Sequence, residues 1–251
     1  YACAARLAKH GIRPLLIGPG LPVDRPPLTK SALAKGTPVL LADEARLAER
    51  GVDRLHALVT GADLAAGVLH AEWGKEVTEV DASHIVLATG LAYPPPPVPG
   101  LAHAFVNANP HVFDRLGPLL AGGPVEVAVV GAGLIGTESA ATLAQAGHDV
   151  TLLDLLDRPL DRLHDPLPEL GAATLDELGV RFLGGVRIES ATEHALETEA
   201  HGTIEADVIL GAHLQELIPA PVRAGSGASV YLHDLRTIED GTAAATADAA
   251  V

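Results

Sequence analysis

The sequence predicts an α/β protein in which parallel strands alternate with helices in two related copies. Residues 127–154 have the pattern of a buried strand, a glycine-rich turn, a helix of small residues and a second apolar strand that ends in an acid. Residues 4–18 align with residues 140–154 at an offset of 136 (140 minus 4). With 251 residues, of which 48% are hydrophobic, the chain is long enough to bury two modest cores.

The strand and turn at the start of the second copy have the features of a dinucleotide site. Val127, Val129 and Val130 form a β-branched run, as in strands buried on both faces of a parallel sheet. The turn matches GxGxxG, in which the glycines permit a tight turn, close approach of a pyrophosphate and close packing of helix on strand. We therefore expect the phosphates to contact Gly131, Gly133, Leu134, Ile135 and Gly136.

An acid at the end of the next strand completes this pattern. Asp154 follows Gly131 by 23 residues (154 minus 131), close to the spacing at which a carboxylate accepts the adenosine ribose hydroxyls. Leu155 and Leu156 come next, where an enzyme that binds a 2′-phosphate would carry an arginine. The pattern thus favours NAD(H) over NADP(H), and a glycine turn in an unrelated α/β unit is the alternative.

The first copy lacks the start of this pattern. Beyond 4–18, residues 46–63 resemble 174–191, and residues 77–90 resemble 202–212. At the offset of 136, Tyr1 falls on Thr137, so the matching strand and glycine loop would precede the first residue. We expect the chain to begin inside a longer sequence.

Composition excludes several classes of function. The net charge of −15 argues against nucleic acid as a partner, because phosphate binding needs a basic surface. Cys3 is the only cysteine, so an internal disulfide and a CxxC redox pair are excluded. The 12 histidines lack metal-ligand spacing, which predicts no metal site. No apolar run reaches about 18 residues and no leader pattern opens the chain, which predicts a cytoplasmic protein.

Charge is uneven along the chain. Residues 1–60 carry nine Lys and Arg against five acids, a balance of +4, which leaves −19 for the remainder. These basic side chains either solvate helix surfaces or form a docking face for an acidic partner.

Four segments, in order, resemble a known family. They are LPVDRPPLTK at 21–30, IVLATG at 85–90, the dinucleotide motif within 125–154, and LRTIEDGTAAATADAA at 235–250. Together they resemble the FAD-dependent pyridine nucleotide oxidoreductases, and within them the rubredoxin reductase and ferredoxin reductase branch. The resemblance implies two Rossmann-like, three-layer nucleotide-binding domains, with the NAD domain inserted into the FAD domain. The implied boundaries are 1–100 with 219–251 for the FAD-binding domain, 101–124 for a connector, and 125–218 for the NAD-binding domain.

The resemblance also implies roles for single residues. Glu138 would lie near the nicotinamide as the catalytic residue, and Asp248 would bind the flavin's ribityl-pyrophosphate portion. Pro26 and Pro27 stiffen their segment, so that neighbouring charges can face one ligand; a rigid surface loop is the alternative. The other expected flavin contacts are Arg25, Lys30, Val59, Ala88, Thr89 and Gly90.

The implied activity is transfer of electrons from NADH through FAD to a small acidic carrier such as rubredoxin or ferredoxin. A disulfide reductase is disfavoured because Cys3 has no partner cysteine. Gly18 stands where the second copy has Asp154, and Ala247 precedes Asp248 where the family has glycine; both departures weaken the flavin site. The competing interpretation is a truncated or non-catalytic NAD(H)-binding module with a degraded flavin site.

Overall fold

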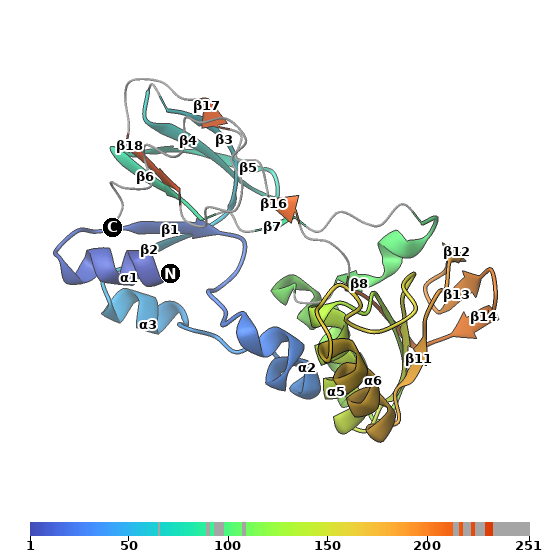
Figure 1. Ribbon diagram of the computed structural model, residues 1–251. Coiled ribbons are helices and arrows are strands. Elements are labelled where there is room, and N and C mark those ends of the chain that lie inside the picture. Colours follow the sequence, from blue (N-terminus) through green and yellow to red (C-terminus); the bar gives the residue numbers. More distant parts are fainter. Residues whose placement is uncertain are drawn as a thin grey trace. The chain divides into compact units, whose positions relative to one another are not determined.

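The structure, a computed structural model, describes residues 1–64, 66–88, 91–92, 98–106 and 109–212, and the backbone at 216–217, 222–223 and 229–232. By internal contacts the chain divides into two units. The first unit comprises Tyr1–Pro22, Ala42–Ala92 and Gln215–Val251, and the second comprises Val23–Leu41 and Tyr93–Leu214. Figure 1 shows the elements of both units.

A parallel five-stranded sheet forms the centre of the second unit. Its strand order is β11-β10-β9-β15-β8, and every neighbouring pair is parallel. Successive residues of β9 face opposite sides, so Val127 and Val129 enter one core cluster and Ala128 enters another. The strands are β8 (Phe105–Val106), β9 (Glu126–Val130), β10 (Asp149–Leu153), β11 (Arg181–Leu183) and β15 (Val208–Gly211).

Different layers cover the two faces of this sheet (Figure 1). On one face, helix residues such as Leu143 and Leu175 pack on Val129. On the other, Leu196 of a three-stranded antiparallel sheet packs with Ala128. The predicted α/β fold with buried parallel strands is confirmed, and this unit has three layers. The covering elements are α4 (Phe113–Ala121), α5 (Leu134–Gln145), α6 (Leu167–Glu177), β12 (Ile188–Ala191), β13 (Ala195–Thr198) and β14 (Gly202–Glu205), with 3-10 turns η2 (Leu101–His103) and η3 (Pro110–Val112).

Residues 23–41 pack with the second unit rather than the first. The segment holds the 3-10 turn η1 (Pro26–Thr29) and helix α2 (Ser31–Lys35), and its Leu28, Ala32 and Leu33 are fully buried in the core beside α4 and α5. Gly117 of α4 permits the approach, since a Cβ there would lie 2.1 Å from the carbonyl oxygen of Gly36. The sequence-derived boundaries group this segment with 1–100, whereas its contacts group it with 93–214.

The first unit repeats the element order of the second. Its order is helix, strand, helix, strand, three antiparallel strands and a return strand, which is also the order from α5 to β15. The predicted repeat is therefore visible in the order of elements. The elements are α1 (Ala2–Lys9), β1 (Leu15–Gly18), α3 (Glu44–Glu49), β2 (Asp53–His56), β3 (Leu58–Asp63), β4 (Val68–Trp73), β5 (Glu76–Asp81) and β6 (His84–Leu87).

Four short strands complete the first unit. β18 (Ser229–Leu232) pairs in parallel with β6, and β17 (Val222–Arg223) pairs in parallel with β3. β16 (Glu216–Leu217) pairs antiparallel with β7 (Leu91–Ala92). The chain thus returns to the first unit after completing the second, as expected when one domain is inserted into another. Among the described residues, no helix is long and apolar enough to span a bilayer.

Candidate dinucleotide site

The glycine loop joins β9 to α5 in a tight turn. Gly131 has a φ of +105°, and its N–H donates to the carbonyl oxygen of Leu153 at 2.8 Å. A Cβ on Gly136 would lie 1.7 Å from the carbonyl oxygen of Gly131, so the helix start fits against the turn only with glycine. A Cβ on Gly133 would meet nothing within 4 Å. The space in front of Gly133 is open, as a bound pyrophosphate requires.

Asp154 is tied to the same turn. One carboxylate oxygen accepts the N–H of Ala132 at 2.5 Å and the other accepts the N–H of Leu156 at 2.8 Å. Each carboxylate oxygen can accept a second hydrogen bond, so the group retains capacity for ribose hydroxyls. The structure thus brings Asp154 to the glycine loop, as the spacing predicts.

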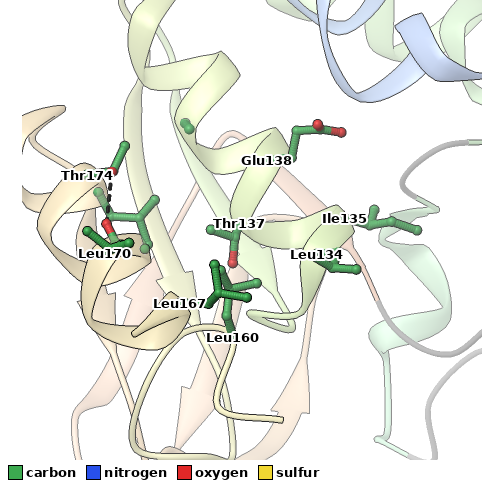
Figure 2. A pocket seen from close by; sticks show the side chains of 11 residues that line it. Leu134, Ile135, Thr137, Glu138, Leu160, Leu167, Leu170 and Thr174 are labelled. Atoms are coloured by element: carbon green, nitrogen blue, oxygen red, sulfur yellow. Dashed lines mark hydrogen bonds between the residues drawn. The ribbon is translucent and has the colours of Figure 1, made fainter. Parts of the chain in front are cut away.

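The segment that follows Asp154 folds back over the glycine loop. The N–H of Leu160 and the hydroxyl of Thr137 donate to the carbonyl oxygen of Ala132, at 2.8 and 3.1 Å. Beside it lies a cavity of about 540 Å³ between α5 and α6, lined largely by apolar residues. Figure 2 shows the Thr137 hydroxyl directed toward Leu160 and Leu167, whereas Glu138 points away from them.

Glu138 is held by the segment at 26–35. Its carboxylate lies 2.7 Å from Lys30 Nζ and accepts a hydrogen bond from the hydroxyl of Thr29. The hydroxyl of Thr142 donates to the carbonyl oxygen of Thr29 at 3.0 Å, which fixes Thr29 on α5. Partial burial raises the pKa of Glu138, but the hydrogen bonds from Lys30 and Thr29 and the charge of Lys30 outweigh it and lower that pKa below its ordinary value. Glu138 is therefore a fixed carboxylate at neutral pH.

The structure thus gathers part of the predicted set in the second unit. The six-residue loop, Asp154, Glu138 and Lys30 all lie on or against α5 and the strands beside it. Arg25 precedes η1 and is exposed. Val59 lies in β3 of the first unit, where it packs against Leu69 and Ile85, and exposed Ala88 follows β6. Thr89, Gly90 and Asp248 lie outside the described residues.

Sequence reasoning missed the side chains that fix the site. Thr29 and Thr142 are found only once α2 is seen against α5, because they are 113 residues apart. Thr29 adjoins Lys30 in the proline-containing motif, which is the one signal that could have drawn attention to it.

The comparison with protein families decides the affiliation. The model of the family described as pyridine nucleotide-disulphide oxidoreductase matches residues 1–213. The chain belongs to the pyridine nucleotide-disulphide oxidoreductase family. Members are FAD-containing, NAD(P)H-dependent oxidoreductases, so the predicted family is confirmed, and so is the predicted cofactor pair as FAD with a nicotinamide dinucleotide.

Relatives include both dehydrogenases and reductases of iron proteins: the dihydrolipoyl dehydrogenase of Acholeplasma laidlawii is 28% identical over 130 residues, 51% of this chain and 38% of that protein. The rhodocoxin reductase of Rhodococcus erythropolis is 29% identical over 226 residues, which cover 84% of this chain and 52% of that protein. The rubredoxin-NAD(+) reductase of Acinetobacter baylyi is 34% identical over 93 residues, 34% of this chain and 24% of that protein. A ferredoxin reductase structure from Rhodopseudomonas palustris has a TM-score of 0.71 at 24% identity and covers 85% of this chain and 55% of its own. The chain thus spans about a quarter to a half of these relatives.

The residues fit the two cofactors unequally. The open space at Gly133, the turn at Gly131 and the carboxylate of Asp154 form a site that suits NAD(H). In the first unit, Gly18 ends β1 at the place where Asp154 follows β10, so no carboxylate is available there for an adenosine ribose. Because three expected flavin contacts lie outside the described residues, the described part of the chain supplies only part of a flavin site.

Proposed function

We propose that the second unit binds NADH, with the pyrophosphate at Gly131–Gly136, the adenosine ribose at Asp154 and the nicotinamide toward Glu138. One observation supports this most strongly: the glycine loop leads into α5, Asp154 accepts a hydrogen bond from that loop, and Glu138 lies on the same helix. The partial positive charge at the start of α5 stabilises the pyrophosphate. Domain boundaries of 125–218 for NAD and of 1–100 with 219–251 for FAD remain part of this proposal.

The activity that we propose is that of an NADH-dependent flavoprotein reductase. Bound FAD would supply the chemistry of hydride acceptance from NADH and of one-electron release to a carrier. Glu138 would contribute charge: a nicotinamide that loses hydride becomes cationic, and a fixed carboxylate beside it stabilises that cation. Lys30 and Thr29 would hold the carboxylate at this place, and the packing of α2 on α5 would fix the two holding residues on that helix.

A small acidic iron carrier is the proposed electron acceptor. The names of two relatives, rubredoxin-NAD(+) reductase and rhodocoxin reductase, support this class of partner. The basic residues Arg6, Lys9, Arg46 and Arg50 are exposed on or beside α1 and α3 of the first unit. Arg54, by contrast, pairs with Glu44 and exposes only 10% of its side chain, so it is poorly placed for docking.

NADH is proposed over NADPH. One structural neighbour, with a TM-score of 0.72 at 18% identity, is an engineered water-forming NADPH oxidase bound to NADPH. In that enzyme a glycine is replaced by alanine, and an aspartate 18 residues later is also replaced by alanine. Arginine is introduced at two positions, one residue and seven residues after that aspartate. In this chain Gly136 and Asp154 have the same spacing (154 minus 136), followed by Leu155 and, seven residues on, Asp161.

Spectroscopy tests the proposed function. The purified protein is expected to be yellow, with a flavin absorbance that bleaches when NADH is added anaerobically and returns when oxidised ferredoxin or rubredoxin is added. A colourless protein that still binds NADH would support the second candidate, an NAD(H)-binding module without flavin, which the glycine at position 18 favours. Failure to bind NADH at all would contradict both candidates.

A further inference from the structure

Arg158 lies in the segment that connects the ribose acid to α6. Its Nε lies 2.7 Å from a carboxylate oxygen of Asp161, and its Nη1 lies 2.8 Å from Glu169 and 3.5 Å from Asp165. Three carboxylates thus surround one guanidinium, and the cluster has a net charge of −2. The hydrogen bond and charge of Asp161, with the charges of the other two acids, raise the pKa of Arg158 further, despite an opposing effect of desolvation.

Both ends of this segment are fixed to the dinucleotide site. At its start, Asp154 accepts the N–H of Leu156; two residues beyond Arg158, the N–H of Leu160 returns to the carbonyl oxygen of Ala132 in the glycine loop. The intervening residues form a short turn beside the expected ribose position. An arginine carries the planar donor set that recognises a 2′-phosphate in NADP-binding proteins.

We propose that Asp161 and Glu169 withhold Arg158 from the 2′-phosphate of NADPH and so act as specificity-determining residues for NADH. This inference rests on the proposed binding of NADH at Gly131–Gly136. While Arg158 is paired with these acids, a 2′-phosphate would meet the negative charges of Asp154 and of the cluster. Like charges repel it. About half of the Arg158 side chain is exposed (46%), so the guanidinium is accessible to a ligand once its acidic partners are removed.

A purely structural role is the alternative. Glu169 lies in the first turn of α6, so the ion pairs also tether the loop to that helix. Exposed ion pairs of this kind contribute little to stability, about 0.2–1 kcal/mol. If the cluster only tethers the loop, its removal lowers stability slightly and leaves the discrimination between NADH and NADPH unchanged.

The test compares the affinities of the purified chain for NADH and NADPH by calorimetry at fixed ionic strength. In the double variant D161N/E169Q, NADPH is expected to bind about tenfold more tightly than in the parent, the effect of about one charge-assisted hydrogen bond. The affinity for NADH is expected to change by less than about twofold, since NADH has no 2′-phosphate. The nucleotide 2′,5′-ADP, which isolates the phosphate, should show the same gain as NADPH.

Two further variants separate Arg158 from general electrostatics. Adding R158Q to the double variant is expected to abolish the gain, whereas the gain would survive if loss of negative charge alone produced it. The control E189Q/E199Q removes two exposed acids of the same unit, one in β12 and one in the turn after β13, and should leave the NADPH affinity unchanged. The single variant E169Q, which leaves Asp161 in place, should give a smaller gain.

The outcomes distinguish the two proposals. If the parent fails to bind NADH, the proposed function is overturned and this inference with it. If NADH binds but NADPH affinity is unchanged in D161N/E169Q, or the gain persists after R158Q, only the role of Arg158 is overturned. Unchanged NADH affinity in each variant also verifies that the site remains folded.

Discussion

Lys30 Nζ lies 2.7 Å from the carboxylate of Glu138, and this ion pair joins residues 108 positions apart (138 minus 30). Glu138 belongs to α5, which carries the glycine loop at its start, whereas Lys30 precedes the short helix α2. The pairing places the charged end of the proline-containing motif at the proposed nicotinamide position. It therefore links two motifs that the sequence assigns to different domains.

Removing the charge of Lys30 should slow hydride transfer while leaving the fold intact. In K30M, the carboxylate of Glu138 loses the Nζ contact that orients it toward the proposed nicotinamide position, and we expect flavin reduction by NADH to slow about tenfold, as when a preorganised electrostatic contact is lost. The stability should fall by less than about 1 kcal/mol, because the pair is more than a third exposed and screened. Stopped-flow measurement of flavin bleaching checks the rate. The matched control K35M, at the last residue of α2, should reduce at the parent rate; equal rates in K30M and K35M would contradict the assignment.

Two glycines of the same loop should respond differently to alanine. In G136A, the new Cβ would lie 1.7 Å from the carbonyl oxygen of Gly131, so we expect overpacking to cost about 1–3 kcal/mol of unfolding free energy. In G133A, the new Cβ meets no protein atom, so stability should change by less than about 0.5 kcal/mol, as for an exposed substitution. NADH affinity should fall in both. Urea unfolding and calorimetry check the pair; unchanged NADH affinity in G133A would place the pyrophosphate elsewhere.

The sequence predicts the second unit well because its information is local. The turn from β9 to α5, with the acid at the end of β10, depends on glycines and on strand periodicity within 28 residues (154 minus 127, plus one). The assignment of 23–41 is less local. Leu28, Ala32 and Leu33 mark an apolar face, but a five-residue helix does not encode which core that face enters. Its partner, α4, lies about 80 residues further along the chain. The contact between Gly36 and Gly117 joins residues with the same separation (117 minus 36).

The polar contacts of the site could not be predicted from the sequence, because they also depend on how distant or folded-back segments meet in three dimensions. Asp154 could be predicted as a ribose ligand from spacing, yet its second role, closing the glycine loop through the N–H of Ala132, depends on the three-dimensional turn. The ion pairs of Arg158 likewise depend on how the loop after Asp154 folds back to α6.

Those two roles of Asp154 should separate by substitution. D154N keeps one carbonyl acceptor for a backbone N–H but loses the charge, and we expect NADH affinity to fall about tenfold with little change in stability. D154A leaves the N–H groups of Ala132 and Leu156 without their acceptor, so stability should also fall by about 1–2 kcal/mol. Calorimetry and thermal unfolding check both. The control D149N, at the exposed start of β10, should match the parent; full NADH affinity in D154A would refute the ribose assignment.

His148 should make the stability of the second unit depend on pH. Burial lowers the pKa of His148 below its ordinary value of 6.5, and its Nδ1 accepts the N–H of Val125 at 3.3 Å, which requires the neutral ring. A lowered pKa in the folded state means that the unfolded chain takes up the proton first as pH falls. Stability should thus be complete above pH 6.5 and decline below it, toward the folded-state pKa. In H148N this decline should be smaller, measured by urea unfolding between pH 7.5 and about 5. Parallel curves for H148N and the parent would contradict this role.

Exposed basic residues of the first unit should set the rate of electron delivery to an acidic carrier. We expect the variant R6Q/K9Q/R46Q to raise the KM for reduced-carrier formation about three- to tenfold at low salt, because electrostatic steering accelerates encounter. The difference should shrink at high salt, where the Debye length falls to about 3 Å at 1 M. R54Q is the informative comparison: with Arg54 paired to Glu44 and its side chain largely covered, this substitution should lower the melting temperature rather than raise KM. Steady-state reduction of ferredoxin or rubredoxin at two ionic strengths checks both. A KM that is equal in the triple variant and the parent at low salt would mean that the carrier docks elsewhere and that these charges only solvate α1 and α3.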